Sequence, residues 1–233
     1  MMQTSPVDYS GHENLETMAA ALRYNGWLTA LVARHAGECR RILDFGAGTG
    51  IFAASLAAWG YDVVAVEPDA TLRGAIAARG IGVVDSLESV APASFGFAYS
   101  LNVLEHIDDD VGVLRALHAT LRPGGTLLLY VPAFPLLTTS MDRAVGHVRR
   151  YLRAELQSKL AAAGFEGARL RYADSLGFFA TLAFKTADPG DGRIRLRPLV
   201  FYDRAVFPLS RRIDAITGRW FGKNLYAVAR KPG

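Results

Sequence analysis

Apolar positions along this chain follow two spacings that alternate. Residues 41–46, RILDFG, form a short apolar run that an acid and a glycine bring to an end. Residues 15–37 instead carry apolar side chains at helical spacing and stop at Gly37. Continuous runs are typical of strands buried on both faces, and the second spacing is typical of amphipathic helices. Strands are therefore predicted at 41–46, 61–69, 81–86, 95–102, 125–132, 168–174 and 224–231, and helices at 15–37, 51–60, 70–80, 108–125 and 154–165.

This order of elements determines the expected fold class. Apolar strands that alternate with helices predict an α/β fold, with a mainly parallel sheet covered by helices on both faces. The chain has 233 residues, which suits one domain with a sizeable core, and it shows no internal repeat. We expect a single domain over residues 1–233: a helical cover at 1–37, a ligand-binding core at 40–132, and a substrate side with a basic cap at 133–233. Residues 185–198 predict a mobile loop.

Composition narrows the class of protein further. The chain is 51% hydrophobic and 21% charged, as globular domains are. Cys39 is the only cysteine, which excludes an intrachain disulfide and a cysteine metal cluster. Residues 1–13 have neither a basic start nor an apolar core, and no apolar run reaches the roughly 18 residues of a membrane span. We therefore expect a cytoplasmic protein without a signal peptide, and the sequence leaves its oligomeric state open.

Charge is distributed unevenly along the chain. Residues 1–142 contain 8 Lys and Arg against 15 Asp and Glu, whereas residues 143–233 contain 18 against 7. This asymmetry indicates either an anionic partner for the C-terminal part or an ordinary solvated arginine-rich face. Residues 198–223 mix apolar and basic side chains, which is consistent with peripheral contact with an anionic membrane, with a cap over the binding site, or with a dimer contact. Pro208 predicts that any helix there is in two pieces.

The most informative motif is the loop after the first predicted strand, GAGTG at residues 46–50. Ligands of open α/β sheets bind beyond the carboxyl ends of the strands, and glycine lets the backbone approach them closely. Glu67, at the end of the next strand, can accept hydrogen bonds from two ribose hydroxyls. The dinucleotide fingerprint requires glycine or alanine at its sixth position, which here is Ile51. Asp44 would repel a pyrophosphate and favours an amine or a cationic ligand.

Five segments occur in order along residues 43–132: LDFGAGTG (43–50), VEPD (66–69), VVDS (83–86), SLNVLEHI (100–107) and LRPGGTLLLYVP (121–132). Together they resemble the class I S-adenosylmethionine-dependent methyltransferases. LRYNGWL and DRAVGHVRRY are also similar to a subgroup of small bacterial methyltransferases that modify sugars, lipids or secondary metabolites. The resemblance implies a Rossmann-like fold with a seven-stranded, mostly parallel sheet and an antiparallel last strand, and it implies S-adenosylmethionine as the cofactor.

The resemblance also implies a role for each matching residue. The glycine loop would pack against the methionine part and the ribose, with Asp44 near the amino group and Glu67 on the ribose hydroxyls. Plain structural roles stay open for Asp44, as a helix cap, and for Asp85 and Asn102, as turn residues. The implied cofactor-binding set is Asp44, Gly46, Ala47, Gly48, Gly50, Glu67, Pro68, Asp85, Ser86, Leu101 and Asn102.

The acceptor side is expected after the fourth and fifth strands. Methyl transfer is an in-line displacement, so the enzyme aligns the nucleophile and removes its proton where necessary. His106 and His147 are the candidate catalytic residues, His147 as a base and His106 in a direct or a structural role. Adjacent arginines can bind a carboxylate or phosphate, although a solvated loop is the plain alternative. The candidate substrate-binding residues are Tyr24, Asp142, Arg149, Arg150 and Tyr151.

These observations favour one function and leave another open. The favoured one is methyl transfer from S-adenosylmethionine to an oxygen or nitrogen of a small molecule, sugar or lipid. The basic C-terminal part leaves room for an acceptor that carries a negative charge. The alternative is a non-catalytic S-adenosylmethionine-binding sensor or partner subunit. Nucleic acid is not favoured as a partner, because NVLE stands where a base-modifying motif would lie and no nucleic-acid module is present. No metal is expected, since His, Cys, Asp and Glu show no ligand spacing.

Overall fold

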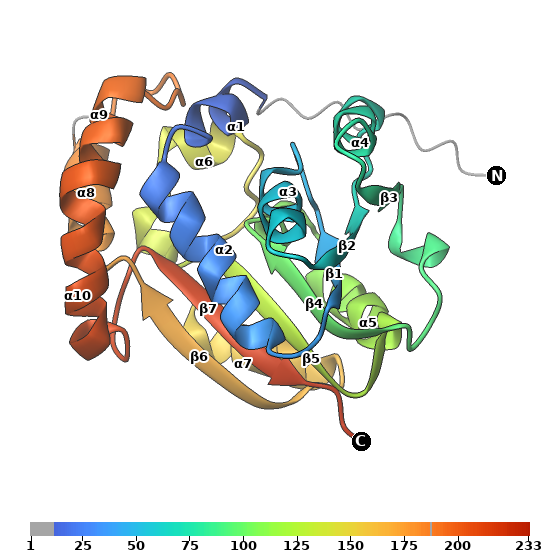
Figure 1. Cartoon of the computed structure of the whole chain (residues 1–233). Helices are drawn as coiled ribbons and strands as arrows, with labels where there is room; N and C mark the ends of the chain where they lie inside the picture. The colour runs from blue at the N-terminus through green and yellow to red at the C-terminus, as the bar shows by residue number, and fades with distance from the viewer. Residues whose placement is uncertain (1–11, 187) are drawn as a thin grey trace.

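The computed structural model describes residues 12–186 and 188–233. Its strands form one sheet in the order β3-β2-β1-β4-β5-β7-β6 (Figure 1). Strands β1 to β5 pair in parallel, whereas β7 runs antiparallel to both β5 and β6. This arrangement confirms the predicted fold class, including the antiparallel last strand. The strands are β1 (Arg41–Phe45), β2 (Asp62–Val66), β3 (Gly82–Val84), β4 (Phe95–Leu101), β5 (Leu121–Pro132), β6 (Glu166–Ala173) and β7 (Asn224–Arg230).

Helices cover both faces of the sheet, and each face has its own apolar core. On one face Leu28 of α2 (Leu22–Ala36) and Ile76 of α4 (Ala70–Ala77) pack in one cluster with Phe97 of β4. α3 (Ile51–Ala58) belongs to the same face. On the other face, α5 (Asp110–Thr120) and α7 (Arg153–Ala162) pack against β5. The central parts of these strands are buried on both sides, which is why their sequences there are mostly apolar.

The predicted helix at 15–37 is wrong in one respect, because the structure divides it into α1 (His12–Met18) and α2. The break has a physical cause far away in the sequence. The carboxylate of Asp203 accepts hydrogen bonds from the backbone N–H groups of Arg23 (3.0 Å) and Tyr24 (2.8 Å). It therefore satisfies donors that a helix N-terminus leaves free, and α2 begins there. The predicted helix at 108–125 also ends early, at Thr120, where β5 begins.

The segment after β6 contains helices that the sequence pattern did not predict. α8 (Ser175–Thr186) follows β6 directly, and α9 (Leu196–Phe201) continues through a π-helical turn (Tyr202–Val206) into α10 (Phe207–Thr217). Pro208 lies at the start of α10, directly after the π-helical turn. Because proline has no backbone N–H, one hydrogen bond of the helix backbone is missing at this point. Helices thus occupy both ends of the predicted loop at 185–198. The remaining elements are α6 (Ser140–Ala144) and the 3-10 turns Leu87–Ser89, Leu104–His106 and Pro135–Leu137.

Within the described ranges, no helix has both the length and the apolar character needed to cross a membrane. The prediction that residues 1–13 lack a signal peptide falls largely on residues 1–11, which lie outside the described part.

Candidate active site

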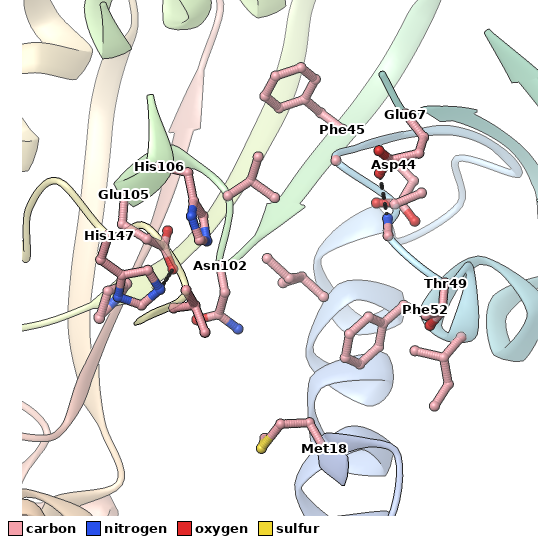
Figure 2. Close-up of a pocket in the computed structure, with 18 of the residues that line it drawn as sticks. Met18, Asp44, Phe45, Thr49, Phe52, Glu67, Asn102, Glu105, His106 and His147 are labelled. Carbon is pink, nitrogen blue, oxygen red and sulfur yellow. Dashed lines mark hydrogen bonds and ion pairs between the residues drawn. The ribbon is translucent and has the colours of Figure 1, made fainter. Parts of the chain in front are cut away.

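A cavity of about 1020 Å³ lies at the carboxyl ends of the parallel strands. Its walls combine the loops after β1, β2, β3 and β4 with α1, α2 and the helices that follow β6. Figure 2 shows Asp44 and Glu67 on one side of it and Glu105, His106 and His147 on the other. The two groups that the sequence assigned to cofactor and acceptor therefore face one space.

The glycine loop at 46–50 has the close backbone approach that its sequence predicts. Gly46 adopts a φ of +75°, and a Cβ there would lie 2.4 Å from Cγ2 of Val103. Gly48 also has a positive φ, of +54°, and lies in the cavity wall. Gly50 does not line the cavity. It precedes α3 with a φ of +73°, and a Cβ added to it would lie 2.9 Å from Cγ1 of Ile76, so the turn itself requires glycine and a ligand contact of Gly50 stays a prediction.

Glu67 holds this loop in shape. One carboxylate oxygen accepts the backbone N–H of Gly48 at 2.8 Å, and the other accepts that of Asp69 at 3.0 Å. The side chain is buried, and burial raises the pKa of Glu67 while the two backbone hydrogen bonds oppose that change. Each carboxylate oxygen can accept about two hydrogen bonds, so both retain capacity for a hydroxyl.

The carboxylate of Asp44 is not fully satisfied by hydrogen bonds within the protein. It is buried at the end of β1, and its Oδ2 finds no hydrogen-bond partner among the described residues. Burial raises the pKa of Asp44 to about 7. A buried polar atom without a partner costs free energy, so an amine at this point would stabilise the ionised carboxylate. This orphaned oxygen, the open glycine loop and Glu67 together fit the amine and ribose of S-adenosylmethionine.

The rest of the predicted cofactor set also lines the cavity. Asp85 is exposed and accepts a hydrogen bond from the Ser89 hydroxyl at 2.9 Å, which lowers the pKa of Asp85. Asn102 follows β4 with a φ of +54°, a conformation that asparagine tolerates better than most residues. The turn roles considered for both residues thus coexist with a place in the wall. Further lining residues from this set are Ala47, Pro68, Ser86 and Leu101.

Two histidines and a glutamate meet on the other side of the cavity. His147 Nδ1 lies 2.8 Å from Asp142 Oδ1, and its Nε2 lies 3.8 Å from Glu105 Oε1. The ring of His106 meets that of His147 edge-on, with centroids 4.6 Å apart. Because an ionised Asp142 can only accept, His147 Nδ1 carries the proton and Nε2 is left as an acceptor.

Burial controls the charge of this group. Glu105 is fully buried, neither carboxylate oxygen has a hydrogen-bond partner among the described residues, and burial raises its pKa to about 8. Burial, with a smaller contribution from His147, lowers the pKa of His106 to about 4. Near neutral pH both groups are therefore uncharged. The Asp142 carboxylate, whose pKa is lowered by its hydrogen bonds to His147 and Arg150 despite burial, is the anion of the site.

Three of the predicted substrate contacts are corrected by the structure. Arg149 pairs with Asp110 (2.6 Å), and the Tyr151 hydroxyl donates to the same carboxylate (2.9 Å), so neither side chain lines the cavity. Asp142 is also buried outside the lining, where it binds His147 and receives two hydrogen bonds from Arg150 (2.9 and 3.0 Å). These residues form the support of the site rather than its surface.

Arg150 and Tyr24 do reach the cavity wall. Arg150 is only 4% exposed, and its guanidinium is occupied by Asp142 and by the carbonyl of Ala133 (3.2 Å). Its predicted role as an anion anchor is therefore revised to that of a structural counter-ion. Tyr24 packs edge-on against Phe207 with centroids 5.4 Å apart, and burial raises its pKa to about 12.

Several lining residues were missed by sequence reasoning. Glu105 stands in the LEHI motif, from which only the neighbouring His106 was predicted as a site residue. Lys223, just before β7, is half-buried, and desolvation lowers its pKa. A cap over the binding site was one alternative for residues 198–223, but no sequence signal singled out the lining residues that follow β6, which are Asp174, Ile194, Leu199, Tyr202, Asp203 and Phe207.

The expectation that no metal is needed rested on sequence spacing alone. The structure brings Glu105, His106 and His147 together with one potential ligand atom each, all within 4.8 Å of one another. Such a set is compatible with a divalent ion as well as with proton transfer, so the expectation remains a prediction.

The fold and the site indicate a class of protein: an α/β fold whose cavity, at the carboxyl edge of the sheet, fits a nucleoside and an amine. Comparison with known families agrees. A family model described as a methyltransferase domain matches residues 12–170, more than half of the chain, and the protein belongs to this family. The proteins that it resembles include an O-methyltransferase and S-adenosylmethionine-dependent methyltransferases.

Individual relatives are similar over about half of the chain. Protein Rv1509 of Mycobacterium tuberculosis is 31% identical over 130 residues, which are 50% of this chain and 44% of that protein. A ubiquinone biosynthesis O-methyltransferase of Xanthomonas campestris is 32% identical over 112 residues, 44% of this chain and 47% of that one. The chain thus matches less than half the length of these two relatives.

Solved structures share the fold over nearly the whole chain. A Thermotoga maritima S-adenosylmethionine-dependent methyltransferase, described as a possible histamine N-methyltransferase, superposes with a TM-score of 0.64 at 18% identity, over 94% of this chain and 95% of that one. The 1,6-didemethyltoxoflavin-N1-methyltransferase of Burkholderia thailandensis gives 0.59 at 20% identity, over 100% and 93%. At these identities the likeness shows the fold alone.

Proposed function

We propose that this enzyme methylates an oxygen or nitrogen of a small-molecule, sugar or lipid acceptor, and that His147 removes the acceptor's proton. The observation that carries the proposal is the Asp142–His147 pair at 2.8 Å, which orients a histidine that lines the same cavity as Asp44 and Glu67. S-adenosylmethionine supplies, when bound, a methyl group activated by a positive sulfur.

The residues of the chain support proton transfer in three ways. Asp142 fixes the tautomer of His147 and stabilises the imidazolium that forms when Nε2 takes a proton. Arg150 keeps Asp142 ionised through two hydrogen bonds. Burial favours the neutral forms of Glu105 and His106, so Asp142 is the charged group in contact with the His147 ring. The proton leaves an O–H or N–H of the acceptor as the new bond to carbon forms.

The cavity wall favours an acceptor with apolar and anionic parts. Phe45, Phe52 and Met18 supply apolar surface near the glycine loop (Figure 2). With Arg150 occupied by Asp142, Lys223 is the lining cation that forms no ion pair with a described carboxylate. We therefore transfer the role of anion anchor from Arg149 and Arg150 to Lys223. Two relatives are named for methylation of oxygen or ring nitrogen, which is compatible with either acceptor atom.

Turnover by variants tests the proposal once acceptors are found by screening metabolites for a mass increase of one methyl group. His147→Ala should lower turnover by roughly 10²–10⁴-fold with unchanged affinity for S-adenosylhomocysteine. His118→Ala is the matched control, because His118 packs on Phe165 away from the cavity. Lys223→Met should mainly raise KM for an anionic acceptor. Equal turnover of the His147 and His118 variants would remove His147 from the chemistry.

A further inference from the structure

The helices after β6 expose apolar side chains and arginines on the same surface. Phe201, Leu209, Ile216 and Trp220 are each between 49% and 70% exposed. Figure 1 shows α8, α9 and α10 gathered beyond the β6 edge of the sheet, to one side of the molecule. α8 packs against α10 and adds the exposed side chains of Phe179, Leu182 and Phe184.

Helical spacing places these residues on one face. Within residues 201–217 the exposed positions are 201, 204, 205, 209, 212, 215 and 216, a spacing that keeps them on one side of the helical segment. Exposed Arg219 and Trp220 follow directly after its end. The opposite face of α10 is buried through Phe207, Ser210 and Asp214. We call the exposed set the docking face: Phe201, Arg204, Leu209, Arg212, Ile216, Arg219 and Trp220.

The acids of this segment face inward, so the docking face is positive. Asp203 caps α2, and Asp214 accepts the backbone N–H groups of Asp174 and Ser175, both at 2.8 Å. Just before the docking face, residues 193–197 add three more exposed arginines against the single exposed acid Asp191.

This combination selects the kind of partner. A symmetric contact with a second copy would place arginines opposite arginines. A nucleic acid would match the arginines but leave Leu209 and Ile216 without apolar contacts. A bilayer with anionic headgroups satisfies both, since the arginines meet phosphates while the apolar side chains and Trp220 enter the interface. We infer that the docking face binds an anionic lipid bilayer.

The docking face and one wall of the cavity belong to the same helical segment. Leu199, Tyr202 and Phe207 come from the same helical segment and line the cavity. A bilayer on the docking face would therefore lie beside a wall of the cavity, where a lipid acceptor could enter. This second step rests on the proposed function, whereas bilayer binding does not.

Vesicle co-sedimentation of the purified full chain tests the binding without any need for turnover. We expect binding to phosphatidylcholine vesicles that contain phosphatidylglycerol and little binding to phosphatidylcholine alone. Replacing Arg212 and Arg219 by Gln should weaken the partition coefficient roughly 30-fold, from about 1 kcal/mol for each basic residue. The matched control replaces Arg34 and Arg79, two exposed arginines outside this segment, by Gln and should bind as the unchanged protein does.

The double variant with Ile216→Ser and Trp220→Ser distinguishes a bilayer from a nucleic acid as the partner of the docking face. It should lower vesicle binding while leaving any binding to duplex DNA unchanged. Three results would overturn the inference: no binding of the unchanged protein to anionic vesicles, an equal loss in the Arg34 and Arg79 control, or a dimer in sedimentation equilibrium that this apolar variant abolishes. If vesicles bind but only soluble acceptors are methylated, the docking face stands and the lipid form of the proposed function fails.

Discussion

Replacing Glu67 by Ala tests the assignment of the ribose site. The change removes the acceptor of the Gly48 and Asp69 N–H groups, at 2.8 and 3.0 Å, and the proposed acceptor of the ribose hydroxyls. Charge-assisted hydrogen bonds contribute about 1.5–3 kcal/mol, so the Kd for S-adenosylhomocysteine should rise roughly 10- to 150-fold. The loss of two loop contacts should also lower the free energy of unfolding by about 1–3 kcal/mol.

Isothermal titration calorimetry, with urea denaturation alongside, separates these two effects. Asp62→Ala is the matched control, since Asp62 lies at the other end of β2, where it forms an exposed ion pair with Arg41. That variant should keep the wild-type Kd. Glu67→Gln should fall between the two, because its amide offers one acceptor where the loop requires two. A folded Glu67→Ala protein that binds S-adenosylhomocysteine with wild-type affinity would refute the ribose assignment.

Three further outcomes are expected. Gly46→Ala should lose about 2–5 kcal/mol of unfolding free energy in urea, because its Cβ meets Val103 and its φ is positive; wild-type stability would show that the loop can relax. The pKa of Glu105, about 8, lies above its usual value, so the unchanged protein should lose stability as the pH rises toward 8; Glu105→Gln should lose less, because only the raised pKa values of Asp44 and Glu67 still contribute, and equal pH profiles in thermal melts would contradict this. Methyl transfer should survive dialysis against a chelator, and a loss that Mg²⁺ or Mn²⁺ restores would show that the Glu105, His106 and His147 group holds an ion.

Local patterns predicted the parts of the fold that local forces determine. The buried stretches of β1, β4 and β5 are mostly apolar because both faces of the sheet are covered, and consecutive residues are enough to show this. The glycine loop and Glu67 were also predictable, since a positive φ and a strand-end acid need only the residues of one β-turn-α unit.

Contacts between distant residues could not be predicted in this way. The start of α2 depends on Asp203, about 180 residues further along the chain, and no pattern near Tyr24 indicates that cap. The same holds for the cavity wall formed by Tyr202 and Phe207. Their segment was recognised as apolar and basic, but its place over the site follows only from how the helices after β6 pack.

The segment DRAVGHVRRY shows why a dense polar motif predicts a site better than it predicts roles. Its acid, Asp142, accepts hydrogen bonds from His147, Arg150 and Thr139, so most of its acceptor capacity is used inside the protein. Arg149 and Tyr151 are likewise taken up by Asp110. A buried charge is tolerated only when it is paired, so most members of such a motif must satisfy one another. His147, which lines the cavity while Asp142 orients its ring, is the member of the motif that we propose for the chemistry.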